Sequence, residues 1–359
     1  MLRTLHAEPL TPISTPISTP ISTLIRSLDP VAPEPQRRAV TTAPMRVSLA
    51  GGGTDLAPFF AGIGGRIVGT AVDVRVRAVV EPFDRGWVQL ELSATNTVIT
   101  RRRDEPPREE IALRLLEAAL AEVGMTGGVR LRLETDVVPG AGLGGSGAAA
   151  VAALAALTAS IGATASREEL ARRALRLERE RMSLACGPQD PYFAAFGGLL
   201  DLRFDERGVM TQEAPAVAAG LLAELGEGML LVDTGQRRVS GEVLDKVPRS
   251  AEVTAELVGA ADEVARGIAA GSIAAVLAGM RRSAAAKLKR DPIGNAAAAA
   301  LGERLREHGA DVVRVCGAGA GGHVLVWARK ERHSAILGAV GGTVRRPAIA
   351  AEGVREEAS

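Results

Sequence analysis

Residues 138–150, with the sequence VPGAGLGGSGAAA, constrain the fold of this chain more than any other stretch. Before them, Val129, Leu131 and Leu133 alternate with charged residues, which is the period of a half-buried strand. After them comes AAAVAALAALTA, a run of strong helix formers. The stretch therefore predicts a strand, a glycine-rich turn and a buried helix. Such a turn gathers backbone N–H groups at the positive end of a helix dipole, which suits a phosphate, and Ser146 stands where its hydroxyl could touch that phosphate or a metal ion on it.

The composition is typical of a globular enzyme of two domains. The chain has 359 residues, of which 47% are hydrophobic and 24% are charged. A formal net charge of +1 indicates neither a nucleic-acid surface nor an acidic tail. Two cysteines far apart and 4 single histidines favour neither a disulfide framework nor a structural zinc site. Since no apolar run reaches the roughly 20 residues that span a bilayer, and no apolar signal segment is seen, we expect a cytoplasmic protein that binds neither nucleic acid nor membranes.

Residues 1–40 are predicted to form a disordered tail rich in Pro, Ser and Thr. Three copies of TPIS fill residues 11–22, and further prolines stand at positions 30, 33 and 35. Proline removes backbone donors and blocks both helix and central strand, so we expect an extended, solvated segment or an over-annotated translation start. A targeting role is a minor alternative.

A second glycine loop follows the first predicted strand of the folded part. Met45, Val47 and Leu49 alternate with polar residues and lead into AGGGTD, which ends at Asp55. One interpretation is a hairpin with an Asx-type turn at Asp55. The other is a backbone without side chains that a ligand can approach, with Asp55 accepting hydroxyl groups. The residues alone favour neither.

Acidic residues stand out in a charged segment and in the loop after it. Residues 166–184 predict a charged helix with a capping box at its start, and most of its carboxylates should form a solvated face. The segment CGPQDPYFAAFGGL follows, and Asp190 stands there between two prolines, just ahead of a helical turn and a strand. Taken alone, Asp190 is best interpreted as a helix N-cap.

The second half of the chain predicts a separate α+β domain from about residue 206 to residue 359, after a first domain at residues 41–205. Its strands are expected at 229–233, 311–316, 323–328 and 343–349, and its helices at 250–268, 272–289 and 294–308. A third glycine loop, GAGAGG at 317–322, joins two of these strands.

Two common nucleotide-binding patterns fit the glycine loops poorly. Residues 140–145 and 317–322 both match the GxGxxG spacing of dinucleotide-binding folds. That fingerprint needs an acidic residue about 20 positions later for the ribose, whereas the first match has no acid before Glu168. The second match leads from strand to strand with no helix. A Walker A loop fails as well, because no lysine follows the glycines.

The three loops together resemble the motifs of the GHMP small-molecule kinases. APMRVSLAGGGTD, VPGAGLGGSGAA and VCGAGAGGHVLV occur in the family's order and spacing, and the resemblance runs from about Ala43 to the C-terminus. AGGGTD and PQDPYFAAFGGL are most similar to the D-glycero-D-manno-heptose 7-phosphate kinases and fucokinase-type sugar kinases. The resemblance implies an α+β fold of two domains, the first like ribosomal protein S5 domain 2 and the second ferredoxin-like.

The resemblance also implies a role for each motif, with ATP and Mg²⁺ as cofactors. Asp190 matches the catalytic carboxylate that orients or deprotonates the sugar hydroxyl, and Arg46 matches an arginine near the transferred phosphate. Ser146 and a glutamate on the next helix match the metal site; Glu178 is the matching position, with Glu180 as the alternative. The ATP phosphates would contact Pro139, Gly140, Ala141, Gly142, Leu143, Gly144, Gly145, Ser146 and Gly147, and the sugar would contact Gly52, Gly53, Thr54, Asp55, Gly317 and Gly319.

This sequence departs from the family pattern at three places. Gly145 and Gly147 replace serines beside Ser146, Pro191 replaces a glutamine after Asp190, and Ala320 interrupts the third glycine run. None of these changes removes a residue assigned to the chemistry.

We expect an ATP-dependent kinase for the anomeric hydroxyl of a sugar, with a heptose 7-phosphate as the favoured substrate. A phosphorylated substrate needs a further cation, for which the candidates are Arg75, Arg77, Arg237 and Arg238. The alternatives are a kinase for an unphosphorylated hexose, a decarboxylase of the mevalonate branch and a non-catalytic binding protein.

Overall fold

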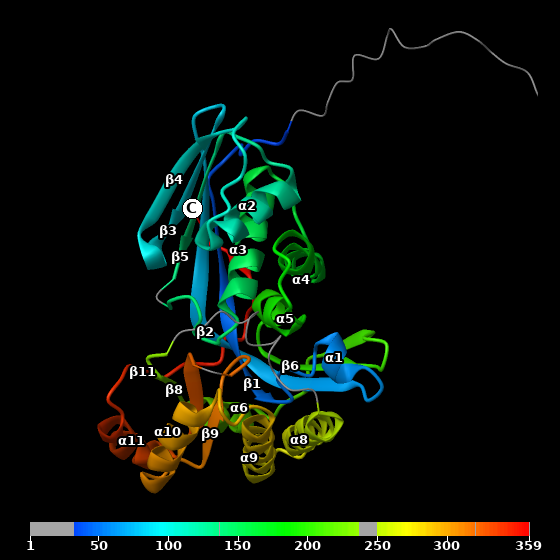
Figure 1. The fold of residues 1–359 in the computed structure, drawn as a ribbon, viewed down its shortest axis with the longest axis vertical. Coiled ribbons are helices and arrows are strands. Elements are labelled where there is room, and N and C mark those ends of the chain that lie inside the picture. The colour runs from blue at the N-terminus through cyan, green and yellow to red at the C-terminus, as the bar shows by residue number, and fades with distance from the viewer. Residues whose placement is uncertain (1–31, 136, 237–249, 320, 359) are drawn as a thin grey trace, which may run out of the picture. The chain divides into compact units, whose positions relative to one another are not determined.

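The computed structural model describes residues 32–135, 137–236, 250–319 and 321–358. Within it, Pro33–Ser359 form one compact unit, which contains a large and a small β-sheet (Figure 1). The predicted tail lies outside the described residues as far as residue 31. Its last part belongs to the folded unit, because the Gln36 backbone N–H donates to the Ser160 carbonyl at 2.8 Å and the first strand begins at Ala39. The folded sequence therefore starts before residue 40.

The large sheet is organised on the long strand β2. In the order β12-β1-β2-β5-β3-β4 it contains β12 (Arg355–Glu356), β1 (Ala39–Ala50), β2 (Gly65–Pro82), β5 (Val129–Glu134), β3 (Trp87–Leu92) and β4 (Thr97–Arg102). β2 is long enough to have two neighbours on one side: residues 77–82 pair with β5, and residues 65–70 pair with β6 (Leu199–Phe204), which also pairs with β7 (Met210–Glu213). β3 and β5 run parallel, and the other strand pairs of this sheet are antiparallel.

Helix α3 (Gly145–Ser160) packs against β1 and β2 at the centre of a helical layer. It contacts α2 (Ile111–Val123), α4 (Arg167–Arg176) and α5 (Gln189–Phe196) (Figure 1). From Gly147 onward α3 is buried almost throughout, as its alanine-rich sequence predicts. Small side chains allow the sheet and three helices to approach one helix closely, and this fixes its N-terminus, where the phosphate loop is predicted.

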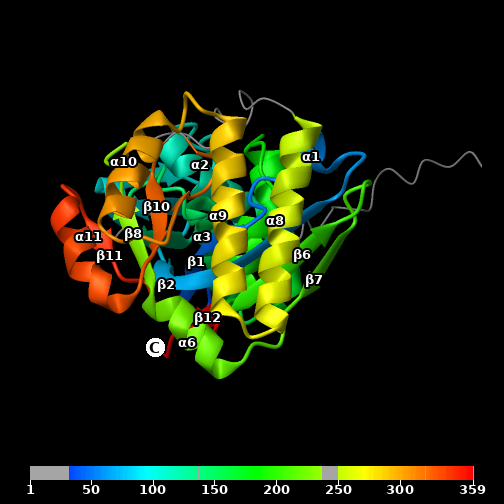
Figure 2. The same ribbon diagram turned by 90° about the horizontal axis from the view of Figure 1, so that it is seen from below.

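The small sheet is antiparallel, with the order β11-β8-β10-β9. Its strands are β8 (Met229–Asp233), β9 (Val312–Val315), β10 (His323–Trp327) and β11 (Val344–Arg345). The helices of this half are α6 (Ala219–Glu227), α8 (Ala251–Ala269), α9 (Ile273–Arg290), α10 (Ala296–Glu307) and α11 (His333–Ala339); the short α1 (Ala57–Phe60) belongs to the first half. Figure 2 shows α8 and α9 side by side. Both contact β1, so one hydrophobic core continues from the large sheet into this helix pair.

Two predicted elements are shorter than expected. The helix predicted over 166–184 is α-helical only from Arg167 to Arg176 and continues as a π-helical turn, Leu177–Arg181. The strand predicted over 343–349 is reduced to β11 and one isolated bridge at Ile349. The large sheet includes β7 and β12 from beyond residue 205, and the predicted domain boundary there stays a prediction.

Candidate active site

The predicted phosphate loop joins β5 to α3. Gly140, Gly142 and Gly144 have φ angles of 85°, 77° and 74°, in the left-handed region that favours glycine. α3 begins at Gly145, so Ser146 and Gly147 lie in its first turn. The N–H groups of a first turn have no partner within their own helix, and the loop therefore presents donors toward an anion.

Ser146 and Glu178 meet although they lie on different elements. The Ser146 hydroxyl donates to Glu178 Oε1 at 2.6 Å. Glu178 is in the π-helical turn and is 2% exposed, whereas Glu180 two residues later is exposed. Burial raises the pKa of Glu178 to about 7, against the opposing effect of the Ser146 hydrogen bond. The structure thus favours Glu178 over Glu180 as the partner of Ser146.

The pair fits a magnesium ion by its chemistry. A hydroxyl and a carboxylate are hard oxygen donors, and Mg²⁺ is usually bound by one or two protein ligands together with substrate phosphates and waters. In the part of the chain that the structure describes, no group of three or more His, Cys, Asp or Glu side chains could hold a metal ion alone. A metal bound at Ser146 and Glu178 would therefore depend on phosphate oxygens to complete its coordination.

Arg46 connects Asp190 to the phosphate loop. Its Nε donates to Asp190 Oδ1 at 2.8 Å, and Nη2 lies 2.6 Å from the same oxygen. Its Nη1 donates to the Gly142 carbonyl at 2.8 Å. Arg46 is 4% exposed in the middle of β1, so its position is fixed by the sheet.

Asp190 is not the N-cap that its sequence position suggested. The N-cap of α5 is Pro188, and Asp190 lies in the first turn of the helix, with its carboxylate bound to Arg46 rather than to a backbone N–H. A Cβ at Gly144 would lie 3.1 Å from the Asp190 carboxyl carbon. The carboxylate thus lies directly beside the phosphate loop.

Asp55 joins the same site through Gln189. The Gln189 backbone N–H donates to Asp55 Oδ2 at 3.3 Å, and its side-chain amide donates to Oδ1 at 3.2 Å. Burial, together with the negative charge of Asp190, raises the pKa of Asp55 to about 6. Asp55 can occupy this position only because residue 187 is glycine, since a Cβ there would lie 1.9 Å from Asp55 Oδ2. The end of the first loop is therefore bound to the segment that carries Asp190.

The third glycine loop supports the phosphate loop. The His323 backbone N–H donates to the Ala141 carbonyl at 2.9 Å, and a Cβ at Gly322 would lie 2.5 Å from that oxygen. Gly317 accepts a hydrogen bond from Lys287, and Gly319 packs against Asn295. Ala320 lies outside the described residues. Close backbone contact explains why glycines are needed here, while sugar contacts at Gly317 and Gly319 stay predictions.

The two glycines beside Ser146 have different surroundings. A Cβ at Gly147 would lie 2.7 Å from Asp190 Cβ and 2.9 Å from the Pro191 nitrogen. A Cβ at Gly145 would meet only the Met45 side chain, at 3.4 Å. Gly147 therefore allows α5 to place Asp190 against α3, and a serine there would force the helices apart.

Of the four arginines proposed for a substrate phosphate, the two that the structure describes are bound to other groups. Arg75 donates to the carbonyls of Glu352 and Gly353, and Arg77 is paired with Glu134 and Glu357. Arg237 and Arg238 lie outside the described residues.

Two other arginines, missed in the sequence, lie beside the first loop. Cβ atoms added at Gly52 and Gly53 would meet Arg314 Nη2 at 3.0 Å and Arg290 Nη1 at 2.7 Å. Arg290 is the last residue of α9, where a basic residue is common because it offsets the helix dipole. Its sequence position therefore gave no signal.

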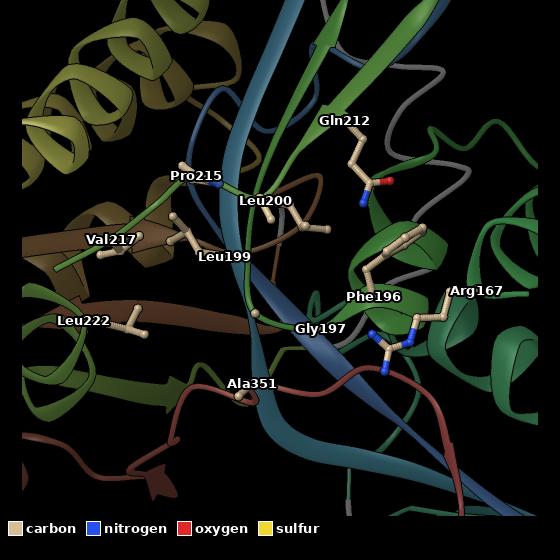
Figure 3. A pocket seen from close by; sticks show the side chains of 12 residues that line it. Arg167, Phe196, Gly197, Leu199, Leu200, Gln212, Pro215, Val217, Leu222 and Ala351 are labelled. Atoms are coloured by element: carbon tan, nitrogen blue, oxygen red, sulfur yellow. The ribbon is translucent and has the colours of Figure 1, made fainter. Parts of the chain in front are cut away.

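The surface also has a hollow of about 410 Å³ away from these groups. Figure 3 shows it between Arg167 and Phe196 on one side and Val217 and Leu222 on the other. Phe196 and Leu199, at the end of the PQDPYFAAFGGL segment, line it, whereas none of the three glycine loops does. Among the described helices, none is long and apolar enough to cross a membrane.

Comparison with known proteins gives a family match within the N-terminal half. Residues 110–198 match the GHMP kinases N terminal domain. The D-glycero-alpha-D-manno-heptose 7-phosphate kinase of Campylobacter jejuni is 24% identical over 169 residues, which are 46% of this chain and 50% of that relative. The alignment thus spans about half the length of the curated relative.

Solved structures extend the similarity to most of the described chain. A D-glycero-D-manno-heptose 1-phosphate kinase from Bacteriodes thetaiotaomicron superimposes with a TM-score of 0.74 at 19% identity, over 89% of this chain and 99% of that one. The Lactococcus lactis galactokinase complexed with galactose gives a TM-score of 0.71 at 15% identity, over 89% and 95% of the two chains. These matches confirm the expected fold class. Residues 110–198 therefore match the GHMP kinases N terminal domain, and the chain has the fold of the GHMP kinases.

Proposed function

We propose that this chain is an ATP-dependent kinase that phosphorylates a hydroxyl group of a sugar. The observation that carries the proposal is the position of Arg46, which holds Asp190 through two guanidinium nitrogens and the phosphate loop through the third. The hydroxyl that accepts the phosphoryl group must approach the γ-phosphate beside the loop. Arg46 holds the Asp190 carboxylate next to that loop. Phosphoryl transfer depends mainly on such positioning and on neutralising charge.

Asp190 is proposed to orient the accepting hydroxyl and to take its proton. Its side chain is 24% exposed, and both contacts from Arg46 are to the same oxygen, Oδ1. Arg46 would then stabilise the negative charge that develops on the transferred phosphoryl group. The N–H groups of the loop and of the first turn of α3 would hold the ATP phosphates.

Mg²⁺ is proposed to be held by Ser146 and Glu178. When bound there, it would neutralise negative charge on the phosphates of ATP. Glu178 must be ionised to serve as a ligand. Its burial beside Ser146 makes ionisation less favourable, and a bound cation would offset this effect.

The favoured substrate is D-glycero-D-manno-heptose 7-phosphate, phosphorylated at its anomeric hydroxyl to the 1,7-bisphosphate. The similarity to the Campylobacter jejuni enzyme and to the Bacteriodes thetaiotaomicron kinase supports a heptose phosphate. The alternative is an unphosphorylated hexose, as in the galactokinase whose structure is similar.

The test is release of ADP by the full-length chain with ATP and Mg²⁺ over a panel of acceptors. The panel contains the heptose with and without its 7-phosphate, fucose, galactose and mevalonate 5-diphosphate. We expect turnover with a sugar and none with the mevalonate derivative. If no sugar supports ADP release above the acceptor-free rate, the kinase proposal is wrong.

A further inference from the structure

Arg290 has a buried guanidinium group whose terminal nitrogens have no acceptor in the described part of the chain. The residue is 4% exposed, and among the described residues neither Nη1 nor Nη2 has a hydrogen-bond partner. The guanidinium carbon lies 5.4 Å from the centre of the Phe59 ring, a cation–π contact that does not use the N–H donors. Since a buried charged donor without a partner is costly, this group calls for an explanation.

Arg290 faces the first glycine loop. A Cβ at Gly53 would lie 2.7 Å from Nη1 and 2.9 Å from Nη2, so both nitrogens reach the place that a side chain would fill. Asp55 is close enough for its charge to raise the pKa of Arg290, against the larger lowering by burial. Its oxygens accept hydrogen bonds from Gln189 instead. The arginine is therefore beside the site but is not neutralised by a direct contact.

A second arginine adds positive charge at the same loop. Arg314, in β9, is 1% exposed and donates through Nη1 to the Ser48 carbonyl at 2.5 Å, whereas its Nε and Nη2 have no partner within the residues that the structure describes. A Cβ at Gly52 would lie 3.0 Å from Nη2. By contrast, the donors of Arg46 are used by Asp190 and Gly142. The guanidinium groups of Arg290 and Arg314, each with N–H donors that no described residue accepts, therefore lie side by side with residues 52 and 53.

We infer that Arg290, assisted by Arg314, binds a phosphate monoester on the substrate, at the end of the sugar away from the hydroxyl that Asp190 activates. This rests on the proposed kinase function and names the chemistry that selects its substrate. Two guanidinium nitrogens match two phosphate oxygens in a bidentate pair. Gln189, next to Asp190 in the chain, binds Asp55 at the end of the first loop, and Arg290 lies against Gly53 of the same loop. Arg290 is therefore separated from Asp190 by this loop, which suits an anion at the other end of the ligand.

Binding requires a local movement. Both Arg290 nitrogens are covered in this structure, and the loop at Gly53 lies over them. The movement is expected at Gly53, which has φ 91° and no side chain between its backbone and the guanidinium group.

The test compares a phosphorylated sugar with the same sugar lacking its phosphate. D-glycero-D-manno-heptose 7-phosphate and the free heptose are titrated into the full-length chain without ATP, and binding is measured by calorimetry. We expect the wild type to bind the phosphate form at least tenfold more tightly. In Arg290→Met this preference should disappear, with the affinity for the free heptose changed less than threefold. The matched control is Arg282→Met, on an exposed turn of the same helix, which should retain the preference.

Kinetics supply the second readout. Arg290→Met should raise KM for the heptose 7-phosphate at least tenfold, with kcat within threefold of the wild-type value. The KM of Arg290→Lys should fall between those of the wild type and Arg290→Met, because lysine keeps the charge without the bidentate geometry. The inference is wrong if a folded Arg290→Met protein keeps the phosphate preference, or loses affinity for both sugars equally. Failure of the kinase proposal can be told apart from failure of this inference. If no ADP is released, calorimetry still measures whether the chain prefers the phosphorylated sugar. If ADP is released but the chain has no preference for the phosphorylated sugar, only the anion site is refuted.

Discussion

At the residue scale, Gly147 shows how a departure from a family pattern can be required by packing. It replaces a serine of the family, and the structure fills the space of its missing side chain with Asp190 and Pro191. Gly145, the other departure, has only the flexible end of Met45 nearby. The two glycines differ in what their backbone neighbours allow, although the sequence presents them as equivalent.

These surroundings predict opposite effects of adding one methyl group. Gly147→Ala should lower the free energy of unfolding by about 1–3 kcal/mol, the usual cost of overpacking a close contact. Gly145→Ala should leave it unchanged or raise it by up to about 1 kcal/mol, because alanine has the higher helix propensity. Urea denaturation of both variants and the wild type measures the difference. Equal destabilisation by the two substitutions would contradict the packing described here.

Asp55 predicts a pH dependence of stability. Its folded pKa of about 6 is above the ordinary value of 3.8, so the folded state holds this proton more tightly than the unfolded chain does. The resulting stabilisation is complete below pH 3.8 and is lost as pH rises through about 6. The ligand-free wild type should therefore lose about 2.5 kcal/mol relative to Asp55→Asn between pH 4 and pH 7.5. Chemical denaturation of both proteins across that range is the measurement, and a constant difference between them would show that the carboxyl is not perturbed.

At the element scale, the π-helical turn Leu177–Arg181 is what places Glu178. A regular helix was predicted here from charge pattern and capping, and this prediction held only as far as Arg176. The turn contacts α2 and α3, and a local sequence pattern does not contain such contacts with elements elsewhere in the chain. π-Helical turns often occur at functional positions, and this one carries the partner of Ser146.

The same turn offers a matched pair of carboxylates for testing the metal site. Glu178→Gln should raise the Mg²⁺ concentration for half-maximal activity at least tenfold, because a neutral amide is a poorer ligand for a hard cation. Glu180→Gln, at an exposed position two residues later, should leave it within twofold. Titration of ADP release with Mg²⁺ at saturating ATP separates the two. If both variants respond alike, Glu178 is not a metal ligand.

At the scale of the whole molecule, the site gathers residues from distant parts of the chain. Arg46 comes from β1, the phosphate loop from the β5–α3 junction, Asp190 from α5 and Arg314 from β9. The glycine motifs and their order were predictable, because a loop that needs small residues shows them as closely spaced glycines in the sequence. The positions of Arg290 and Arg314 beside the first loop were not predictable. Each residue belongs to an ordinary helix or strand pattern, and its contact with Gly53 or Gly52 arises only in the folded chain. Gln189 was likewise missed as the link between Asp55 and Asp190.

The most direct test of the central claim is phosphoryl transfer by Asp190→Asn. Asparagine keeps the size of the side chain but cannot accept the proton of the attacking hydroxyl. With the preferred sugar from the acceptor panel, transfer measured in a single turnover should fall by about 10²–10⁴-fold, while the Kd for ATP stays within threefold of the wild-type value. Undiminished transfer in this variant would contradict the role given to Asp190 and, with it, the site built around Arg46.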